Sequence, residues 1–318
     1  KWNPPFKLPP RGHSPSGVVP ALREEMSCFW SCVCIVLLMA PKVEPLALPG
    51  AGTRQALNQV VFVRHGESTW NREGIYIGWT DVPLTAAGEL EARAAGQVLL
   101  RAGYQFDRVF TSLLKRSLKT THLVMQELDQ LWVQETKDWR LNERFFGGLI
   151  GKTKPEAEHA FGKDKVALWG ASYDTPPAPM STESSLYPGD DPRYQGLAEI
   201  PTSECMRDVQ ARVVQLWEEE ITPAVRSGQQ VLVSGHANNL KALLKHLDGI
   251  PDETAVGLSI PRATPIAYDL DVQGAGGQMR VVPSPRAASP LSGEFVAAPA
   301  ELEAMVEVAV AESGAVAA

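Results

Sequence analysis

Cysteine is scarce in this sequence, which has four among 318 residues. Cys28, Cys32 and Cys34 lie near the N-terminus, and only Cys205 lies in the body of the chain. So few cysteines form no disulfide framework, and we expect a reducing compartment, cytoplasmic by default, for the mature domain. Cys32 and Cys34 could ligate a metal, but their neighbours are apolar and no second ligand pair follows. We therefore expect no metal site.

Positive charge is also in short supply. The chain has 30 Lys and Arg against 37 Asp and Glu, a net charge of −7, and no basic stripe is evident. This composition argues against nucleic acid as a partner. An acidic enzyme can still bind an acidic substrate when a few arginines are focused in one cleft.

Long apolar runs are missing as well. The longest follows Met26 and covers about thirteen residues, which is short for a membrane span but normal for a signal-peptide core. If Met26 is the true start, the run predicts an organelle or secretory targeting signal, although no basic residue lies between Met26 and the run. The alternative is that this stretch derives from an untranslated region. We expect no membrane partner for the mature domain.

The most informative stretch joins an apolar run to three residues suited to phosphate chemistry. Residues 60–63 predict a buried strand, and Arg64, His65 and Gly66 follow it directly. Ligands of α/β folds collect at the carboxyl ends of strands. There a neutral imidazole can attack phosphorus, an arginine can bind phosphate oxygens as a fork, and a glycine lets backbone approach an anion. Taken alone, the pattern also fits a surface histidine after a strand.

The second half of the chain repeats this arrangement. Residues 230–234 predict a second buried strand that ends at His236, and the helix that follows should end at Gly249. Between the two histidines, a short strand precedes Arg116, which should open another helix whose apolar face is Leu118, Val124, Met125 and Leu128. Two histidines and two arginines that converge on strand ends predict a pocket for a phosphoryl group.

Periodic apolar residues predict the rest of the fold. Thr85 can cap a helix that Gly103 stops, and apolar residues recur at helical spacing from Met206 to Trp217. Such helices alternating with short buried strands predict an α/β fold of three layers, a mostly parallel sheet with helices on both faces. We expect a catalytic domain over 56–271, between an N-terminal extension and linker at 1–55 and a flexible C-terminal tail at 272–318. Within that tail, residues 299–312 could form a terminal helix.

These motifs resemble those of the cofactor-dependent phosphoglycerate mutases, in the histidine phosphatase superfamily. The matching stretches are residues 64–68 with Trp70 and Asn71, residues 78–84, Thr111 and Ser112 with Lys115 and Arg116, residues 139–144, residues 172–177, and Gly235 with His236. The Arg-His-Gly motif is shared by the whole superfamily. Leu-Asn-Glu-Arg at 141–144 and Ser-Tyr-Asp-Thr-Pro-Pro at 172–177 point to the mutase branch.

The resemblance implies a phosphoglycerate mutase-like fold and interconversion of 3-phosphoglycerate and 2-phosphoglycerate through a phosphohistidine. The cofactor would be 2,3-bisphosphoglycerate as priming phosphoryl donor, with a small phosphorylated substrate as partner and a homo-oligomer as a further expectation. His65 would be the nucleophile, and Arg64, Arg116 and His236 would hold the oxygens of the transferring group. Glu143 would be the general acid and base. Its alternative is a structural salt bridge to Arg140 or Arg144.

The resemblance also implies a set of substrate-binding residues. They are Asn71, Ile77, Gly78, Arg144, Phe146, Lys154 and Asn238. For Asn238 the binding group would be the backbone N–H at a helix start.

The distal part of that set departs from the mutase pattern. Gly170 and Ala171 stand where two arginines are usual, Phe146 replaces a tyrosine, Ile77 replaces a hydroxyl residue, and Ala237 replaces a glycine. The tail carries no lysine, whereas the mutase tail carries several. Each lost charge-assisted bond removes roughly 1.5–3 kcal/mol of binding. Either Arg193 or Lys152 substitutes, or the substrate has changed, or the chain is a decaying paralogue.

Three functions therefore remain open at this point. The first is the mutase, the second is a phosphatase of the same superfamily that acts on a small phosphorylated metabolite, and the third is a non-catalytic paralogue with a vestigial site. Mutase and phosphatase differ in water exclusion and in retention of the intermediate, which the sequence does not determine.

Overall fold

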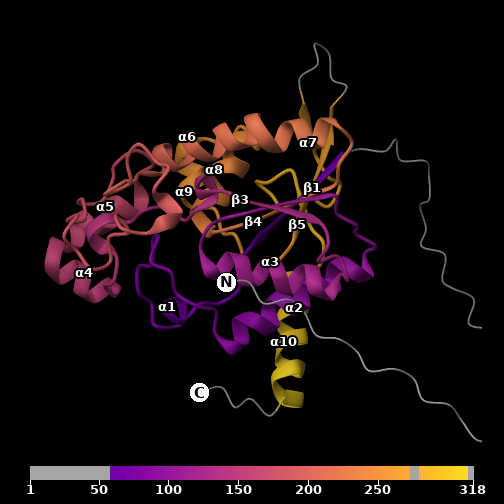
Figure 1. Ribbon diagram of the computed structural model, residues 1–318, viewed down its shortest axis with the longest axis horizontal. Coiled ribbons are helices and arrows are strands. Elements are labelled where there is room, and N and C mark those ends of the chain that lie inside the picture. Colours follow the sequence, from indigo (N-terminus) through magenta and orange to yellow (C-terminus); the bar gives the residue numbers. More distant parts are fainter. Residues whose placement is uncertain (1–57, 273–278, 314–318) are drawn as a thin grey trace, which may run out of the picture. The chain divides into compact units, whose positions relative to one another are not determined.

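The computed structural model describes residues 58–272 and 279–313 (Figure 1). The predicted extension at 1–55, with its targeting run and three of the cysteines, lies outside these residues. Within the described part, no helix is both long enough and apolar enough to cross a membrane.

Four parallel strands form one side of the sheet. They are β1 (Asn58–Arg64), β2 (Arg108–Thr111), β3 (Gln134–Lys137) and β4 (Val231–Gly235), in the order β3-β2-β4-β1 with β3 at the edge of the sheet. The register pairs Val63 with Ser234, and Ser234 with Thr111, so three strands end at the same level. The residues that follow β1, β2 and β4 therefore meet at one edge of the sheet.

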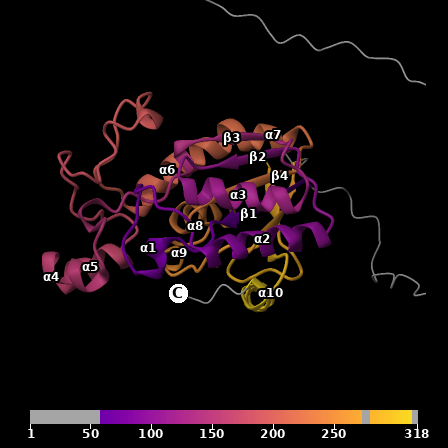
Figure 2. The same ribbon diagram turned by 60° about the horizontal axis from the view of Figure 1, so that its bottom comes forward.

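Three antiparallel strands extend this sheet beside β1. β5 (Ile266–Asp271) pairs with β1, while β6 (Arg280–Val282) and β7 (Glu294–Phe295) pair with β5. After β7, helix α10 (Pro299–Ser313) packs on α2 (Ala86–Arg101), where Leu302 joins Ala94 and Val98 in a small core (Figure 2). The sequence predicted a flexible tail from 272 in which residues 299–312 could form a helix. That helix is confirmed as α10, whereas the strands β6 and β7 in the described parts of the segment were not predicted.

Helices cover both faces of the sheet, as Figure 1 shows. On one face lie α6 (Met206–Leu216), α7 (Thr222–Arg226) and α8 (Ala237–Asp248), whose apolar side chains pack on Phe62, Val233 and Tyr268. On the other face lie α2 and α3 (Lys115–Glu127), which pack on Val61, Val109 and Leu232. The predicted three-layer α/β fold is confirmed.

The chain between β3 and α6 forms a layer of short helices and loops. Its helices are α4 (Lys154–Phe161) and α5 (Lys163–Ala171). Two further short helices, α1 (Thr69–Arg72) and α9 (Asp252–Val256), lie elsewhere in the described chain. An aromatic cluster of Trp79, Phe145 and Tyr194 holds this layer, with Trp79 and Tyr194 ring centroids 4.9 Å apart. The layer thus has a core separate from those on the two faces of the sheet.

Predicted helix boundaries are confirmed where a local signal sets them. The Thr85 hydroxyl accepts a hydrogen bond from the Gly88 amide (2.9 Å) and begins α2. Gly249 adopts φ of 63° and ends α8, because a left-handed residue there closes the helix at little cost for glycine.

The predicted apolar face of α3 is only partly correct. Val124, Met125 and Leu128 are buried, but the first half of the helix buries Ser117, Thr120 and other polar groups, while Leu118 is half-buried. The reason is that this half lies beneath strand ends that carry polar groups. Ser117 bonds to the hydroxyls of Thr111 and Ser234 at the ends of β2 and β4, and Thr120 accepts a hydrogen bond from the Gly66 amide.

Two glycines bring α2 against the segment that follows β1. A Cβ on Gly66 would overlap the carbonyl oxygen of Gly88, and a Cβ on Gly88 would overlap the carbonyl oxygen of Glu67. Both glycines are therefore required by a close approach of two backbones. This is a different reason for Gly66 from the approach of an anion that the sequence suggested.

We expect Gly88→Ala to lower the free energy of unfolding by about 1–3 kcal/mol, because the added methyl group forces two backbones apart. The matched control is Gly170→Ala, also within a helix, where no atom lies within 4 Å of the added carbon. That control should be neutral or slightly stabilising. Urea unfolding of both variants makes the comparison, and equal effects would contradict the close approach.

Candidate functional site

The two histidines predicted to act together are neighbours. His65 follows β1 and His236 follows β4, and their ring centroids lie 4.9 Å apart. Both side chains are buried. Parallel pairing of β1 and β4, with Arg64 opposite Gly235, is what brings two residues 171 positions apart into contact.

The hydrogen bond of His65 identifies its free ring nitrogen. Nδ1 lies 2.7 Å from the carbonyl oxygen of Gly66. A carbonyl only accepts, so Nδ1 carries the proton and Nε2 keeps its lone pair. Burial, followed by the charges of Arg116 and Arg64, holds the pKa of His65 well below its usual range. His65 is therefore a neutral imidazole at neutral pH with Nε2 available as a nucleophile.

Arg116 is fully buried, and backbone carbonyls fix its guanidinium. It donates to the oxygens of Thr80 (3.0 Å) and Gly78 (2.9 Å), which leaves Nε without a partner among the described residues. Burial lowers the pKa of Arg116 to about 10, so it remains a cation at neutral pH.

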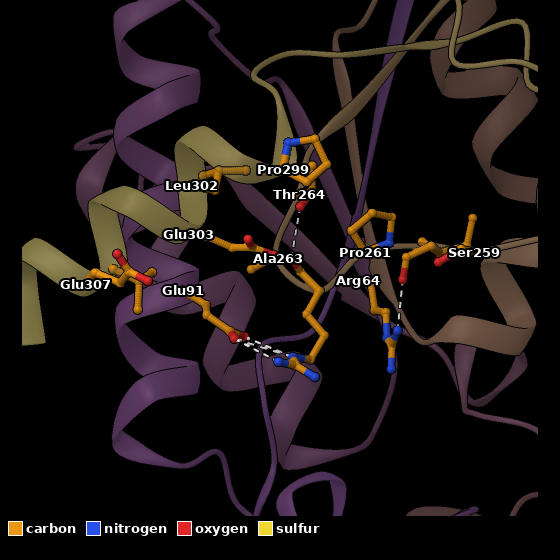
Figure 3. A pocket seen from close by; sticks show the side chains of 13 residues that line it. Arg64, Glu91, Ser259, Pro261, Ala263, Thr264, Pro299, Leu302, Glu303 and Glu307 are labelled. Atoms are coloured by element: carbon orange, nitrogen blue, oxygen red, sulfur yellow. Dashed lines mark hydrogen bonds and ion pairs between the residues drawn. The ribbon is translucent and has the colours of Figure 1, made fainter. Parts of the chain in front are cut away.

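Arg64, the residue before His65, is also held by a backbone carbonyl. Its Nη1 donates to the carbonyl oxygen of Ile260 (2.8 Å), and its buried Nε finds no acceptor in the described chain (Figure 3). The neighbouring Arg262 instead pairs with the Glu91 carboxylate at 3.3 Å. Arg64 thus keeps its charge available where Arg262 does not.

Together these groups form a centre with positive charge and unused donors. Arg116 and Arg64 both lower the pKa values of His65 and His236, which places all four groups within electrostatic reach. A buried donor without a partner costs about 1–3 kcal/mol. A phosphoryl group would satisfy several such donors at once and neutralise the charge.

Glu143 lies at this centre as a buried carboxylate. Its Oε1 accepts from the backbone amides of Arg144 (2.7 Å) and Asn238 (3.2 Å), and its charge raises the pKa of Arg64 and of Arg116. The alternative of a salt bridge to Arg140 or Arg144 is not seen in the described residues. Arg140 pairs with Asp138 and Glu219.

A buried ion pair that the sequence analysis missed holds the segment around Glu143. Arg212 of α6 binds both oxygens of Glu204 (2.7 and 2.9 Å). Its guanidinium also donates to the carbonyl oxygens of Arg140, Asn142 and Glu143 at 2.8–3.0 Å. The sequence feature that could have revealed this ion pair is an arginine within the apolar pattern of residues 206–217. We used that pattern only to predict a helix of the fold.

Two further residues fix this segment from other elements. Asn239 of α8 accepts from the His236 amide (2.6 Å) and donates to the Leu141 carbonyl (2.7 Å), so it connects the second histidine to the segment of Glu143. The Trp79 indole N–H donates to the Glu143 carbonyl (2.6 Å). Neither residue has a local sequence pattern that predicts these contacts.

Several predicted substrate-binding residues are engaged within the protein. Asn71 Oδ1 accepts from the backbone and hydroxyl of Ser68, and the Asn238 amide bonds to Glu143. Gly78 binds Arg116 through its carbonyl, and Ile77 beside it is buried. Their roles as substrate ligands remain predictions.

The distal anion binders do not form a cationic clamp. Arg144 is buried, bonded to the Glu204 carbonyl (2.7 Å) and 5.4 Å from the centroid of the Phe146 ring. Lys154 is 72% exposed and lies 4.0 Å from Glu158. Gly170 and Ala171 are exposed at the end of α5 and supply no charge.

The two suggested substitutes for the missing arginine pair are also engaged. Arg193 binds Asp191 and Asp81, at 2.5 and 2.7 Å, so its charge is already balanced. The Lys152 ammonium lies 6.0 Å from the centroid of the Phe161 ring. Across residues 58–272 and 279–313, no group of three or more His, Cys, Asp or Glu side chains is arranged to hold a metal ion.

Removal of Arg212 should test the network that holds Glu143. Arg212→Met leaves Glu204 buried without its partner, so we expect a loss of about 3–5 kcal/mol in the free energy of unfolding. Arg207→Met is the matched control on the same helix, because its ion pair with Asp174 is 61% exposed and should contribute about 0–1 kcal/mol. Urea unfolding that showed equal losses would contradict the network.

The buried histidines should make stability fall on mild acidification. Their pKa values are depressed in the folded protein, whereas the unfolded chain takes up these protons from about pH 6.5 downward. Each histidine should therefore lower the free energy of unfolding by up to about 1.4 kcal/mol for each pH unit below that value. Urea unfolding between pH 7.5 and 5.5 should show a flatter slope for the double variant His65→Gln/His236→Gln.

The exposed His122 provides the control for this experiment, and His122→Gln should keep the wild-type slope. A double variant with an unchanged slope would show that the two site histidines do not titrate differently in the folded and unfolded states.

Several solved structures resemble this fold at low sequence identity. YhfR of Bacillus stearothermophilus is 23% identical with a TM-score of 0.55, and the match covers 70% of this chain and 95% of that one. The alpha-ribazole phosphatase of Shigella flexneri is 21% identical with a TM-score of 0.53, covering 70% and 94%. A mycobacterial glucosyl-3-phosphoglycerate phosphatase is 20% identical with a TM-score of 0.52, covering 70% and 97%. At these identities the likeness shows the fold alone.

The sequence itself matches a family over more than half of its length. The family described as the histidine phosphatase superfamily (branch 1) matches residues 60–276, a span that contains both histidines, both site arginines and Glu143. Because this match covers more than half of the chain, the protein belongs to the histidine phosphatase superfamily, branch 1.

Proposed function

We propose that this protein transfers a phosphoryl group from a small phosphorylated metabolite to His65. The observation that carries the proposal is the state of His65, a buried neutral imidazole whose free Nε2 is within electrostatic reach of Arg116, which is buried, and of Arg64, which is partly buried. Each arginine has a buried Nε donor without a partner among the described residues. Phosphoryl transfer asks little of a protein beyond positioning and charge stabilisation. The end of β1 positions Arg64 and His65, and Arg116 of α3 adds a second charge.

The reaction would proceed in two displacements. In the first, Nε2 of His65 attacks phosphorus, the bond from phosphorus to the ester oxygen breaks, and protonated Glu143 gives its proton to the leaving oxygen. In the second, an acceptor hydroxyl attacks the phosphohistidine, its proton passes to the Glu143 carboxylate, and the N–P bond breaks. Arg64 and Arg116 would stabilise the charge on the phosphoryl oxygens in both steps.

Hydrolysis, with water as the acceptor, is the net reaction that the site supports best. A mutase must hold a phosphorylated acceptor by its far end as well, and the positions of the usual arginine pair are Gly170 and Ala171. Arg193 is neutralised by two carboxylates, so it does not replace them. Water needs no distal clamp. The substrate class would be a phosphomonoester of a small metabolite.

Phosphoglycerate mutase activity is the second candidate, because a specific segment favours it. Residues 141–144 resemble the mutase motif, and they carry Glu143 into the centre on the Arg212 network. In this version 2,3-bisphosphoglycerate would prime His65, and 3-phosphoglycerate would be the acceptor. The nearly complete burial of His65 also suits an intermediate that is kept from water.

Labelling of His65 tests the part that both versions share. Incubation with ³²P-labelled 2,3-bisphosphoglycerate, and separately with a labelled phosphomonoester, should give an acid-labile and base-stable adduct, because a phosphohistidine has these stabilities. His65→Asn should abolish the adduct, while His122→Asn, at an exposed histidine, should retain it. Equal labelling of both variants would overturn the assignment, and no labelling of the wild type would favour a non-catalytic protein.

The net reaction can then be read from the products. With 3-phosphoglycerate, followed by ³¹P NMR with and without 2,3-bisphosphoglycerate, hydrolysis should release inorganic phosphate, and a mutase should form 2-phosphoglycerate only when primed. Formation of 2-phosphoglycerate faster than phosphate would reverse our order of the two candidates.

A further inference from the structure

Ser112 contacts His236, the second histidine of the site. It follows β2, is fully buried, and its hydroxyl oxygen lies 2.8 Å from Nε2 of His236. The register of β2 with β4, which pairs Thr111 with Ser234, sets this contact. The pairing of β2 with β4 therefore positions Ser112 beside His236.

The direction of this hydrogen bond follows from the other partner of Ser112. The backbone N–H of Leu114 donates to the same hydroxyl oxygen at 3.2 Å. An N–H can only donate, so the hydroxyl proton must find a separate acceptor. Within the described chain the only such acceptor that contacts Ser112 Oγ is Nε2 of His236.

An accepting Nε2 leaves the ring proton of a neutral His236 on Nδ1. That nitrogen is buried and has no partner in the described parts of the protein, and the centroid of its ring lies 4.9 Å from that of the His65 ring. The opposite tautomer would place a lone pair at Nδ1, which repels the anion that the surrounding arginines attract. The Nδ1–H tautomer places a donor there.

We propose that Ser112 is a positioning residue that fixes His236 as its Nδ1–H tautomer and so presents a neutral N–H donor to a phosphoryl oxygen. The inference rests on the proposed function only in naming the phosphoryl group as the acceptor. Both site histidines then carry their proton on Nδ1, but they use opposite atoms. His65 donates that proton to Gly66 and offers its lone pair, whereas His236 accepts from Ser112 and offers its proton.

The tautomer can be measured on the full chain without substrate, which separates this proposal from the proposed function. Long-range ¹H–¹⁵N spectra of protein labelled with ¹⁵N-histidine, at pH 7.5, report which nitrogen of each ring is protonated. The His236 signals are identified by their loss in His236→Gln. We expect protonated Nδ1 and bare Nε2 for His236. Protonation at Nε2 in the wild type would overturn the proposal.

Ser112→Ala removes the fixing group, so the His236 signals should change to a mixture of tautomers or to Nε2–H. Ser112→Thr keeps a hydroxyl and should restore Nδ1–H. The matched control is Ser117→Ala, because Ser117 is equally buried and its hydroxyl contacts only Thr111 and Ser234 among the described side chains. Unchanged Nδ1–H signals in Ser112→Ala would also overturn the proposal.

The rate of phosphohistidine formation gives a second readout. We expect about a 10²-fold lower rate in Ser112→Ala, as for the loss of one oriented donor, recovery in Ser112→Thr, and no change in Ser117→Ala. An equal fall in Ser112→Ala and Ser117→Ala would indicate a general packing effect and contradict a role through His236. Should wild-type protein form no adduct, the proposed function fails while the tautomer measurement still decides on Ser112.

Discussion

The site depends on two arginines that lie largely inside the protein. Neither of them forms a salt bridge with a carboxylate of the described residues, so each keeps its positive charge in a place where charge is costly. Arg64 and Arg116 are bonded to backbone carbonyls, and among the described residues neither pairs directly with an acid. Taking a cation from water costs several kcal/mol unless charge and hydrogen bonds compensate. Burial lowers the pKa values of both arginines, and Glu143, at longer range, offsets part of that lowering. The remaining compensation is what a bound phosphoryl group would provide.

Burial, and then the same charges, explain the state of the histidines. An imidazole that is away from water and beside two guanidinium groups has a depressed pKa, so His65 and His236 are neutral and their two nitrogens are distinct. The neighbouring hydrogen bonds then decide which atom each ring presents. A centre with fixed charges and fixed tautomers needs little reorganisation when phosphorus changes partners.

The geometry depends on contacts between segments that are distant in sequence. Arg212, Glu204 and Asn239 connect α6 and α8 to the segment of Glu143, and on the other face Thr120 of α3 accepts a hydrogen bond from the Gly66 amide beside His65. This explains what the sequence could and could not predict. The two strands before His65 and His236, the cap at Thr85 and the stop at Gly249 follow from local patterns and were predicted. Each of the connecting residues acts through a partner tens of residues away, which no local pattern specifies.

Other differences have the same origin. The first half of α3 buries polar side chains because it packs against the strand ends that carry the site. Position 66 must be glycine because its backbone contacts Gly88, and this contact depends on where α2 packs. Arg193 looked like a free cation in the sequence, but folding places it between Asp81 and Asp191. The ordered strands and helix after residue 279 pack on β5 and α2, contacts that a Gly- and Pro-rich sequence does not reveal.

A crystal structure with orthovanadate would test the central claim most directly, because vanadate adopts the trigonal bipyramidal geometry of phosphoryl transfer. Our account predicts that Nε2 of His65 is an apical ligand of vanadium and that the equatorial oxygens accept hydrogen bonds from Arg64, Arg116 and Nδ1 of His236. Vanadate bound at another site, or bound at this one without a bond to His65, would contradict it.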